Sequence, residues 1–145
     1  MNIRPVHRDD LPAWRALWAA YQSFYEVALS EETTATTWAR LFEADSTIHA
    51  LVAEEDGTVI GLCHYIVHAN TWEVDPVCYL EDLYVEPAGR ARGVGEALIA
   101  HLRSMMSSEK WSRIYWMTRE DNYRARGLYD KFVKRDAFVR YVIRR

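Results

Sequence analysis

The most constraining stretch of this sequence is YLEDLYVEPAGRARGVGEAL, which occupies positions 79–98. Its pattern predicts a strand, a loop rich in arginine and glycine after Pro87, and a helix that begins at Gly93. This order brings the unpaired backbone N–H groups of a helix N-terminus together with the guanidinium groups of Arg90 and Arg92. Because such a place attracts phosphate, we expect a phosphate-bearing cofactor to bind here.

Two well-known phosphate-binding loops do not fit this stretch. A Walker loop requires a lysine and then a serine or threonine after its last glycine, and neither Gly93 nor Gly95 is followed by them. The dinucleotide-binding fingerprint requires a third glycine three residues after the second, where this sequence has Leu98. The loop therefore belongs to another class of phosphate site.

Length, charge and composition narrow the function further. A chain of 145 residues is expected to form a single domain, 1–145, with its own core. A net charge of −3 argues against a nucleic-acid partner. No signal peptide and no long apolar run are present, so we expect no membrane partner and a cytoplasmic location. Cys63 and Cys78 are expected to be buried, reduced thiols.

The order of the predicted elements is β-α-α-β-β-β-α-β-α-β. Asp56-Gly57 predicts a tight hairpin turn, and the second half contains a β-α-β unit. We therefore expect one α/β domain, with a mixed, mostly antiparallel sheet of six or seven strands flanked by helices. The predicted strands are 2–6, 47–54, 58–68, 77–86, 112–118 and 136–144, and the predicted helices are 10–26, 33–44, 93–107 and 123–134.

The loop Arg90-x-x-Gly93-x-Gly95 resembles the acetyl-CoA loop of the GCN5-related N-acetyltransferase (GNAT) family. The resemblance extends from Ile3 to about Tyr141, and only the segment Phe132–Arg135, where the family usually has Gly-Phe, departs from it. Within the family, the chain most resembles the yeast histone and polyamine acetyltransferase type. The supporting motifs are Ile3-Arg4-Pro5, Asp9-Asp10, Val59-Ile60-Gly61, Leu83-Tyr84-Val85-x-Pro87, Asn122-x-x-Ala125 and Leu128-Tyr129-x-x-Phe132.

The resemblance implies a single GNAT fold and acetyl-CoA as the cofactor. In this family the strand before the loop binds the pantetheine arm through its backbone, and a backbone N–H near Leu83 would polarise the acetyl carbonyl. Asn122 matches a position that hydrogen-bonds the cofactor, and it also suits a helix N-cap. The implied cofactor-binding residues are Leu83, Tyr84, Val85, Arg90, Ala91, Arg92, Gly93, Val94, Gly95 and Asn122.

The resemblance also implies the catalytic groups. Tyr129 matches the general acid that protonates the departing thiolate, and its alternative role is a core residue of its helix. Glu81 is the favoured general base, with Asp82 as its competitor. Because neighbouring residues of a regular strand point to opposite faces, we expect only one of these carboxylates to face the cleft. Either one could instead serve only in local structure.

The resemblance implies an amine-binding pocket shaped by the first two helices and by the loop 69–76 after the third strand. Aromatic and acidic side chains there suit a cationic amine through cation–π contact and charge pairing, although Trp18 and Trp38 also have core spacing. We expect ordinary sheet packing for His64, with a role on the amine side as the alternative, and no bound metal. The implied substrate-binding residues are Trp18, Tyr21, Glu26 and Trp38.

The expected reaction is direct transfer of an acetyl group from acetyl-CoA to a small primary amine, such as a polyamine or an amino-acid-like amine. Three alternatives remain open, which are acetylation of a protein lysine or N-terminus, a non-catalytic acyl-CoA-binding domain, and a structural α/β domain without a cofactor. The run 138–143 is of the kind through which family members pair, so a homodimer is expected, with a monomer as the alternative.

Overall fold

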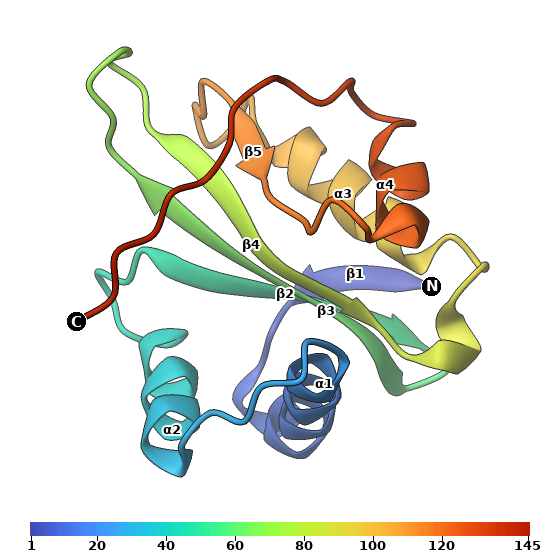
Figure 1. Cartoon of the computed structure of the whole chain (residues 1–145). Helices are drawn as coiled ribbons and strands as arrows, with labels where there is room; N and C mark the ends of the chain where they lie inside the picture. Colours follow the sequence, from blue (N-terminus) through green and yellow to red (C-terminus); the bar gives the residue numbers. More distant parts are fainter.

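The computed structural model describes residues 1–145, in which a sheet lies between two layers of helices (Figure 1). Short 3-10 turns precede α1 and follow β4, at Arg8–Asp10 and Pro87–Gly89. The strands are β1 (Asn2–Pro5), β2 (Ile48–Glu55), β3 (Thr58–His68), β4 (Val77–Val85) and β5 (Ile114–Trp116). The helices are α1 (Leu11–Phe24), α2 (Glu31–Arg40), α3 (Val94–Met105) and α4 (Tyr123–Tyr129).

The sheet has five strands in the order β1-β2-β3-β4-β5. The first four strands are antiparallel neighbours, whereas β5 pairs with β4 in parallel. Asp56 and Gly57 both have positive φ angles, 50° and 76°, as the predicted hairpin turn between β2 and β3 requires. The α/β class and the mixed, mostly antiparallel sheet are thus confirmed, but the expected number of strands was too high.

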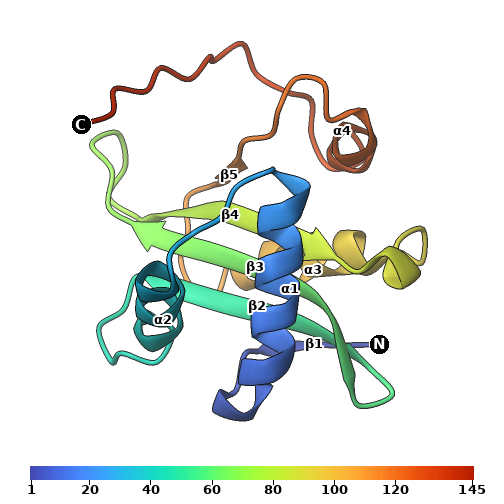
Figure 2. The same ribbon diagram turned by 60° about the horizontal axis from the view of Figure 1, so that its bottom comes forward.

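Each face of the sheet is covered by two helices. Figures 1 and 2 show α1 and α2 on one face, and α3 and α4 on the other. The core is correspondingly divided into a cluster beneath α1, which includes Trp14, Leu17 and Leu62, and a cluster beneath α3. Gly61 lets α3 approach the sheet closely, since a Cβ there would lie 3.0 Å from a Val94 methyl group.

The predicted last strand, 136–144, is absent. Residues 136–145 form an irregular segment that leaves α4 and runs past β5 without joining the sheet (Figure 2). Phe138, Tyr141 and Ile143 are 83%, 91% and 101% exposed. A strand needs a neighbour to accept and donate its backbone hydrogen bonds, and this segment has no such neighbour within the chain. The prediction was wrong because it considered only the apolar composition of this segment.

Several element ends also differ from the predicted ones. Helix α2 begins at Glu31 because Ser30 caps it, accepting a hydrogen bond from the Thr33 N–H at 3.0 Å. Helix α4 ends at Tyr129 rather than at position 134, and β5 is only three residues long. The two cysteines are buried and unpaired, as expected.

Candidate active site

A bulge in β4 organises the candidate site. The β3–β4 register pairs His64 with Asp82 but Tyr65 with Leu80, so Glu81 is an extra residue without a partner on β3. A bulge of this kind interrupts the alternation of side chains between the two faces of a sheet. Leu80 and Leu83 accordingly both pack against the cluster beneath α3.

The bulge places Glu81 and Asp82 between Leu80 and Leu83, which both pack beneath α3, so the two carboxylates lie on the other face of the sheet. Burial and the neighbouring Asp82 charge raise the pKa of Glu81, although its side chain keeps contact with solvent. Burial and the same Asp82 carboxylate raise the pKa of the Tyr21 hydroxyl on α1. The expectation that Glu81 and Asp82 point to opposite faces was therefore wrong, because it assumed an unbroken strand.

Asp82 is held by a buried chain of hydrogen bonds. Its Oδ2 lies 3.0 Å from Nδ1 of His64, and Nε2 of the same imidazole accepts the indole N–H of Trp14 at 2.9 Å. Trp14 and His64 are buried between α1 and the sheet, whereas the Asp82 side chain is 14% exposed. His64 therefore does more than pack in the sheet, and Trp14 is a contact that the sequence did not reveal.

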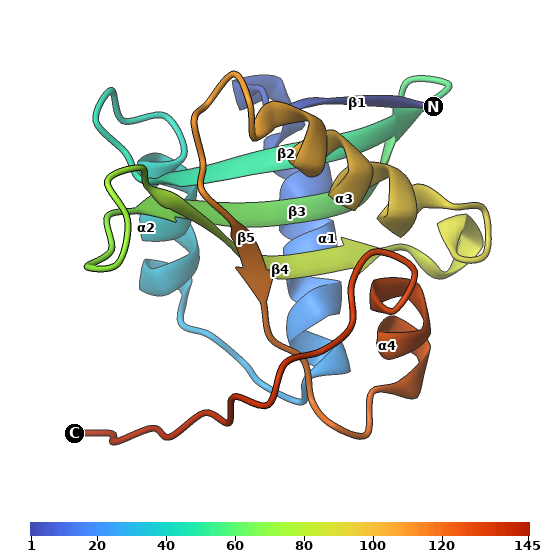
Figure 3. The same ribbon diagram turned by 90° about the horizontal axis from the view of Figure 1, so that it is seen from above.

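Beyond the bulge, β4 has a free edge. Pairing between β4 and β5 ends at Leu80 with Trp116, and Figure 3 shows the two strands diverging from there. Backbone groups of an antiparallel strand face its neighbour at every second residue. Since Glu86 N–H donates to Ile60 on β3 at 3.0 Å, the backbone groups of Leu83 face the opening instead. A strand-like ligand could add to this edge through hydrogen bonds.

Tyr129, the last residue of α4, lies at this opening. It packs against the cluster beneath α3 and meets Trp116 edge-to-face, with ring centroids 5.6 Å apart. Its hydroxyl is also near enough to Tyr25 of α1 for the two groups to interact electrostatically. Trp116 is the last residue of β5 that pairs with β4, so the contact with Trp116 places Tyr129 where the two strands separate. Burial raises the pKa of Tyr129 to about 12.

The loop after β4 leads into a helix start with unused hydrogen-bond donors. Ala91 and Gly93 both have positive φ angles, 65° and 80°, which turn the chain sharply into α3. No protein acceptor is bonded to the four backbone N–H groups from Gly93 to Glu96. Together with the helix dipole, these groups form a site suited to an anionic phosphate. A side chain at Gly95 would meet Leu128 at 3.0 Å, so this glycine lets α4 pack close to α3.

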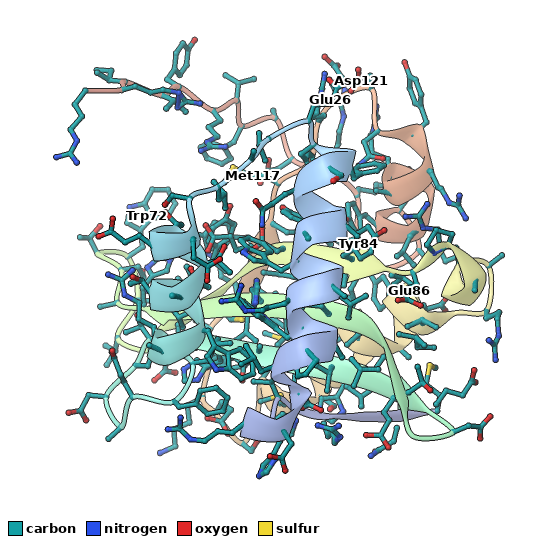
Figure 4. All side chains as sticks on the ribbon, turned by 90° about the horizontal axis from the view of Figure 1, so that it is seen from below. Glu26, Trp72, Tyr84, Glu86, Met117 and Asp121 are labelled. Atoms are coloured by element: carbon teal, nitrogen blue, oxygen red, sulfur yellow. The ribbon has the colours of Figure 1, made fainter.

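The two arginines of the loop are partly engaged by the protein. Nε of Arg90 donates to the Val85 carbonyl at 2.9 Å, and its guanidinium lies 5.4 Å from the Tyr84 ring centre. Arg92 forms an ion pair with Glu55 of β2. Such an exposed ion pair contributes little to stability, so Arg92 remains available to a phosphate. Figure 4 labels Tyr84 and Glu86, which lie at the end of β4 beside this loop.

Asn122 acts as the N-cap of α4. Its side-chain oxygen accepts the Ala125 N–H at 3.4 Å, while its Nδ2 donates to Thr118 Oγ1 at 3.1 Å. The capping role expected from the sequence is confirmed. Any contact between Asn122 and a cofactor stays a prediction.

The four residues predicted to bind the amine separate into two groups. Trp18 is buried and Trp38 packs against the cluster beneath α1, so these two belong to the core. Tyr21 stacks on Trp18, with ring centroids 5.3 Å apart, and contacts Tyr25 at a tilted angle, with centroids 4.9 Å apart, which continues an aromatic row along α1. Glu26 is exposed just beyond α1, on the same side of the molecule as Asp121 (Figure 4).

No group of three or more histidine, cysteine, aspartate or glutamate side chains is placed to hold a metal ion. None of the helices combines the length and the apolarity needed to cross a bilayer. The candidate site therefore consists of the carboxylates at the bulge, the free edge of β4, the loop before α3, and Tyr129.

The sequence and the structure were compared with those of known proteins, and these comparisons identify the family. The model of the acetyltransferase (GNAT) family matches residues 14–133. The chain belongs to the GNAT family. It is an acetyl-CoA-dependent N-acetyltransferase, as its named relatives are. The resemblance drawn from the loop motif and its companion motifs is confirmed.

Two relatives and one solved structure illustrate the similarity. A D-amino-acid N-acetyltransferase of Saccharomyces cerevisiae, HPA3, is 33% identical over 96% of this chain and 88% of its own length. An aminoglycoside N(6')-acetyltransferase type 1 of Salmonella typhimurium is 31% identical over 69% of this chain and 68% of its own length. The structure of AAC(6')-Iy in complex with a bisubstrate analogue, CoA-S-monomethyl-acetylneamine, has a TM-score of 0.82 at 22% identity, covering 99% and 97% of the two chains.

Acetyl-CoA is the cofactor of this acetyltransferase, as it is of the family. The structure fits that cofactor in two independent places. The free N–H groups before α3 suit a pyrophosphate, and the free edge of β4 suits the amide-bearing pantetheine arm. When bound, acetyl-CoA supplies an activated thioester, which leaves binding, placement and proton transfer to the protein.

Proposed function

We propose that this acetyltransferase acetylates the amino group of small amines of the amino-acid type, by direct transfer in a ternary complex. The observation that carries this proposal is the pair of carboxylates at the β4 bulge, immediately before the free edge at Leu83. Two negative charges attract an ammonium group, and the raised pKa of Glu81 suits a group that must accept a proton.

Glu81 is the proposed general base, with Asp82 as the alternative. As the extra residue of the bulge, Glu81 is more exposed than Asp82, whose Oδ2 is committed to His64. The backbone N–H of Leu83 would stabilise the negative charge that develops on the acetyl oxygen. Tyr129 is the proposed acid, since its raised pKa keeps the phenol protonated while a thiolate leaves beside it.

For cofactor binding, we propose that the strand end Leu83-Tyr84-Val85 holds the pantetheine arm, through the backbone groups of Leu83 and the N–H of Val85 that face the opening. The loop from Arg90 to Gly95, including Ala91 and Val94, would then hold the pyrophosphate, and Asn122 would contact the arm from the start of α4. The free N–H groups and the available charge of Arg92 support these assignments. Tyr21 and Tyr25 would form an aromatic wall for the acceptor, with Glu26 at its rim.

The C-terminal segment offers a partner for the acceptor's carboxylate. The positive charge of Arg140 acts against the rise in the pKa of both Glu81 and Tyr79. An amino acid carries an ammonium and a carboxylate, which match the acidic pair and Arg140 respectively. The name of the Saccharomyces cerevisiae relative, a D-amino-acid N-acetyltransferase, also supports this choice.

The test is an acceptor panel in which release of coenzyme A thiol from acetyl-CoA is measured. The panel holds amino acids of both configurations, their carboxamides, linear polyamines and a lysine-containing peptide. We expect the free amino acids to show a lower KM than the carboxamides, and Arg140→Ala to remove the difference. Turnover with the polyamines or the peptide alone would overturn the amino-acid assignment and identify the acceptor class directly.

We also propose a homodimer in the cytoplasm. The apolar side chains at 138–143 are exposed to water in a single chain, and a second copy could cover them. The two buried free thiols, Cys63 and Cys78, suit a reducing compartment.

A further inference from the structure

His64 of β3 is enclosed by groups from two other elements, α1 and β4. The indoles of Trp14 and Trp18 on α1 lie around its ring, with centroids 5.9 and 5.1 Å away. Asp82 lies opposite His64 on β4, and His64 itself is 2% exposed. Burial of this degree requires that both ring nitrogens have hydrogen-bond partners.

The hydrogen bonds to Trp14 and Asp82 are compatible with only one placement of the proton on the His64 ring. An indole N–H can only donate, so the Nε2 that receives it from Trp14 at 2.9 Å must be unprotonated. The single remaining proton is then on Nδ1, which donates to Asp82 Oδ2 at 3.0 Å. A doubly protonated ring would set its Nε2–H against the donor of Trp14. The chain therefore runs Trp14 to His64 to Asp82, with each N–H donating in the same direction.

The protonation of His64 determines the net charge of the His64–Asp82 pair that faces the amine of the acceptor. A neutral imidazole fixes one oxygen of Asp82 without cancelling its negative charge, whereas an imidazolium would form a neutral ion pair. The Asp82 charge acts on Tyr21 of α1 and on Glu81, and it raises the pKa of both groups. Burial also makes the uncancelled charge more effective than it would be in water.

We propose that Trp14 and His64 are positioning residues that fix the tautomer of the imidazole and thereby hold Asp82 as an oriented anion for the acceptor's ammonium group. This inference rests on the proposed function of the Glu81–Asp82 site. The indole matters to the substrate although it never contacts it, because it excludes the second proton from His64.

The tautomer can be observed directly in the unaltered protein. Long-range proton–nitrogen correlation spectra of the nitrogen-15-labelled chain at pH 7 distinguish protonated from unprotonated ring nitrogens. We expect His64 to show a protonated Nδ1 and an unprotonated Nε2. A protonated Nε2, a charged ring or an average of the two tautomers would overturn the proposal, and none of these readings depends on turnover.

Trp14→Phe then tests the effect on the acceptor. Without the indole donor, we expect the imidazole to exchange between tautomers and the KM for the amine to rise by about tenfold, with a smaller change in kcat. Trp111→Phe is the matched control, because it makes the same substitution in the buried cluster beneath α3, away from the site. It should leave both the His64 spectrum and the KM near their original values.

The spectrum of His64 and the KM of Trp14→Phe test the positioning role separately from the acetylation of amines. If no amine is acetylated but His64 shows the expected tautomer, the proposed function fails while the hydrogen-bond arrangement stands. If amines are acetylated and Trp14→Phe, shown to be folded by its spectrum, has the original KM, the positioning role is refuted. If Trp14→Phe does not fold, the spectrum of the unaltered protein still decides the tautomer.

Discussion

Leu80 and Leu83 lie three positions apart in β4, yet both side chains pack on the face of the sheet that α3 covers. In a regular strand, residues separated by an odd number of positions point to opposite faces. The bulge at Glu81 adds one residue and so shifts the alternation by one position. The side chains of Glu81 and Asp82 therefore lie on the same face of the sheet instead of on opposite faces. One extra residue in β4 thus places two acidic side chains on one face of the sheet.

The first prediction concerns the pH dependence of turnover. Glu81 must be ionised to accept a proton, and its pKa is raised, so kcat at saturating substrate should fall as the pH drops through a value above the ordinary one of about 4.3. Asp82→Asn removes the neighbouring negative charge, which should lower the pKa of Glu81 and move this fall to lower pH. A shift toward higher pH would contradict the coupling.

The choice of base is tested by comparing two isosteric variants. Glu81→Gln should reduce kcat by about a hundredfold or more, since it removes the proton acceptor while keeping the shape. Asp82→Asn should mainly raise the KM for the amine. Pre-steady-state and steady-state measurement of thiol release will separate the two effects. The reverse pattern would assign the base to Asp82.

The third prediction concerns the proposed acid. Tyr129→Phe should lower kcat by about a hundredfold while leaving the dissociation constant for coenzyme A, measured by calorimetry, close to its original value. Because burial raises the pKa of Tyr129 to about 12, the phenol stays protonated below that pH, and this residue should cause no alkaline loss of kcat below it. Tyr65→Phe, another buried tyrosine on the side of α3, is the control. An alkaline fall that disappears in Tyr129→Phe would contradict the raised pKa, and an unchanged kcat in Tyr129→Phe would contradict the assignment of the acid.

Two glycines allow a matched test of the phosphate loop. Gly57 and Gly93 have similar φ angles, 76° and 80°, and at neither would a Cβ meet another atom within 4 Å. Replacing either by alanine should therefore cost a similar amount of unfolding free energy, about 1 kcal/mol, by denaturant titration. Only Gly93→Ala should weaken coenzyme A binding, by about tenfold, because it moves the free N–H groups before α3. Equal affinities in the two variants would show that the loop does not hold the cofactor.

The last prediction concerns assembly. Removing residues 136–145 eliminates the exposed apolar run, so the shortened chain should sediment as a monomer at concentrations where the full chain sediments as a dimer. Analytical ultracentrifugation over a concentration series measures both states. A full-length chain that stays monomeric throughout the series would contradict the dimer.

Much of this molecule could be predicted from local sequence signals. The hairpin at Asp56-Gly57, the free donors before α3 and the burial of both cysteines depend on turn chemistry, helix geometry and apolarity, which neighbouring residues determine. The matching motifs from Ile3 to Tyr129 then identified the family. These features are local or repeated along the chain, and so they can be seen without coordinates.

What escaped prediction depends on contacts between distant residues. The bulge at Glu81 is visible only in the pairing of β4 with β3, and the bond from Trp14 to His64 joins residues 50 positions apart. The segment 136–144 has the composition of a strand, but it lacks a partner within one chain. Trp18 and Trp38 illustrate the same limit, since helical spacing alone does not distinguish core from pocket.

The most direct test of the account follows the acetyl group itself. Acetyl-CoA labelled with carbon-13 in the acetyl carbonyl is incubated with the full-length chain and an amino acid, and the products are observed by NMR. We predict that the label appears in the N-acetyl amide of the acceptor, in equal amount to the thiol released, and that Glu81→Gln slows both together. Label that appears only as free acetate, or that stays in the thioester while coenzyme A binds, would contradict transfer to an amine at the β4 bulge.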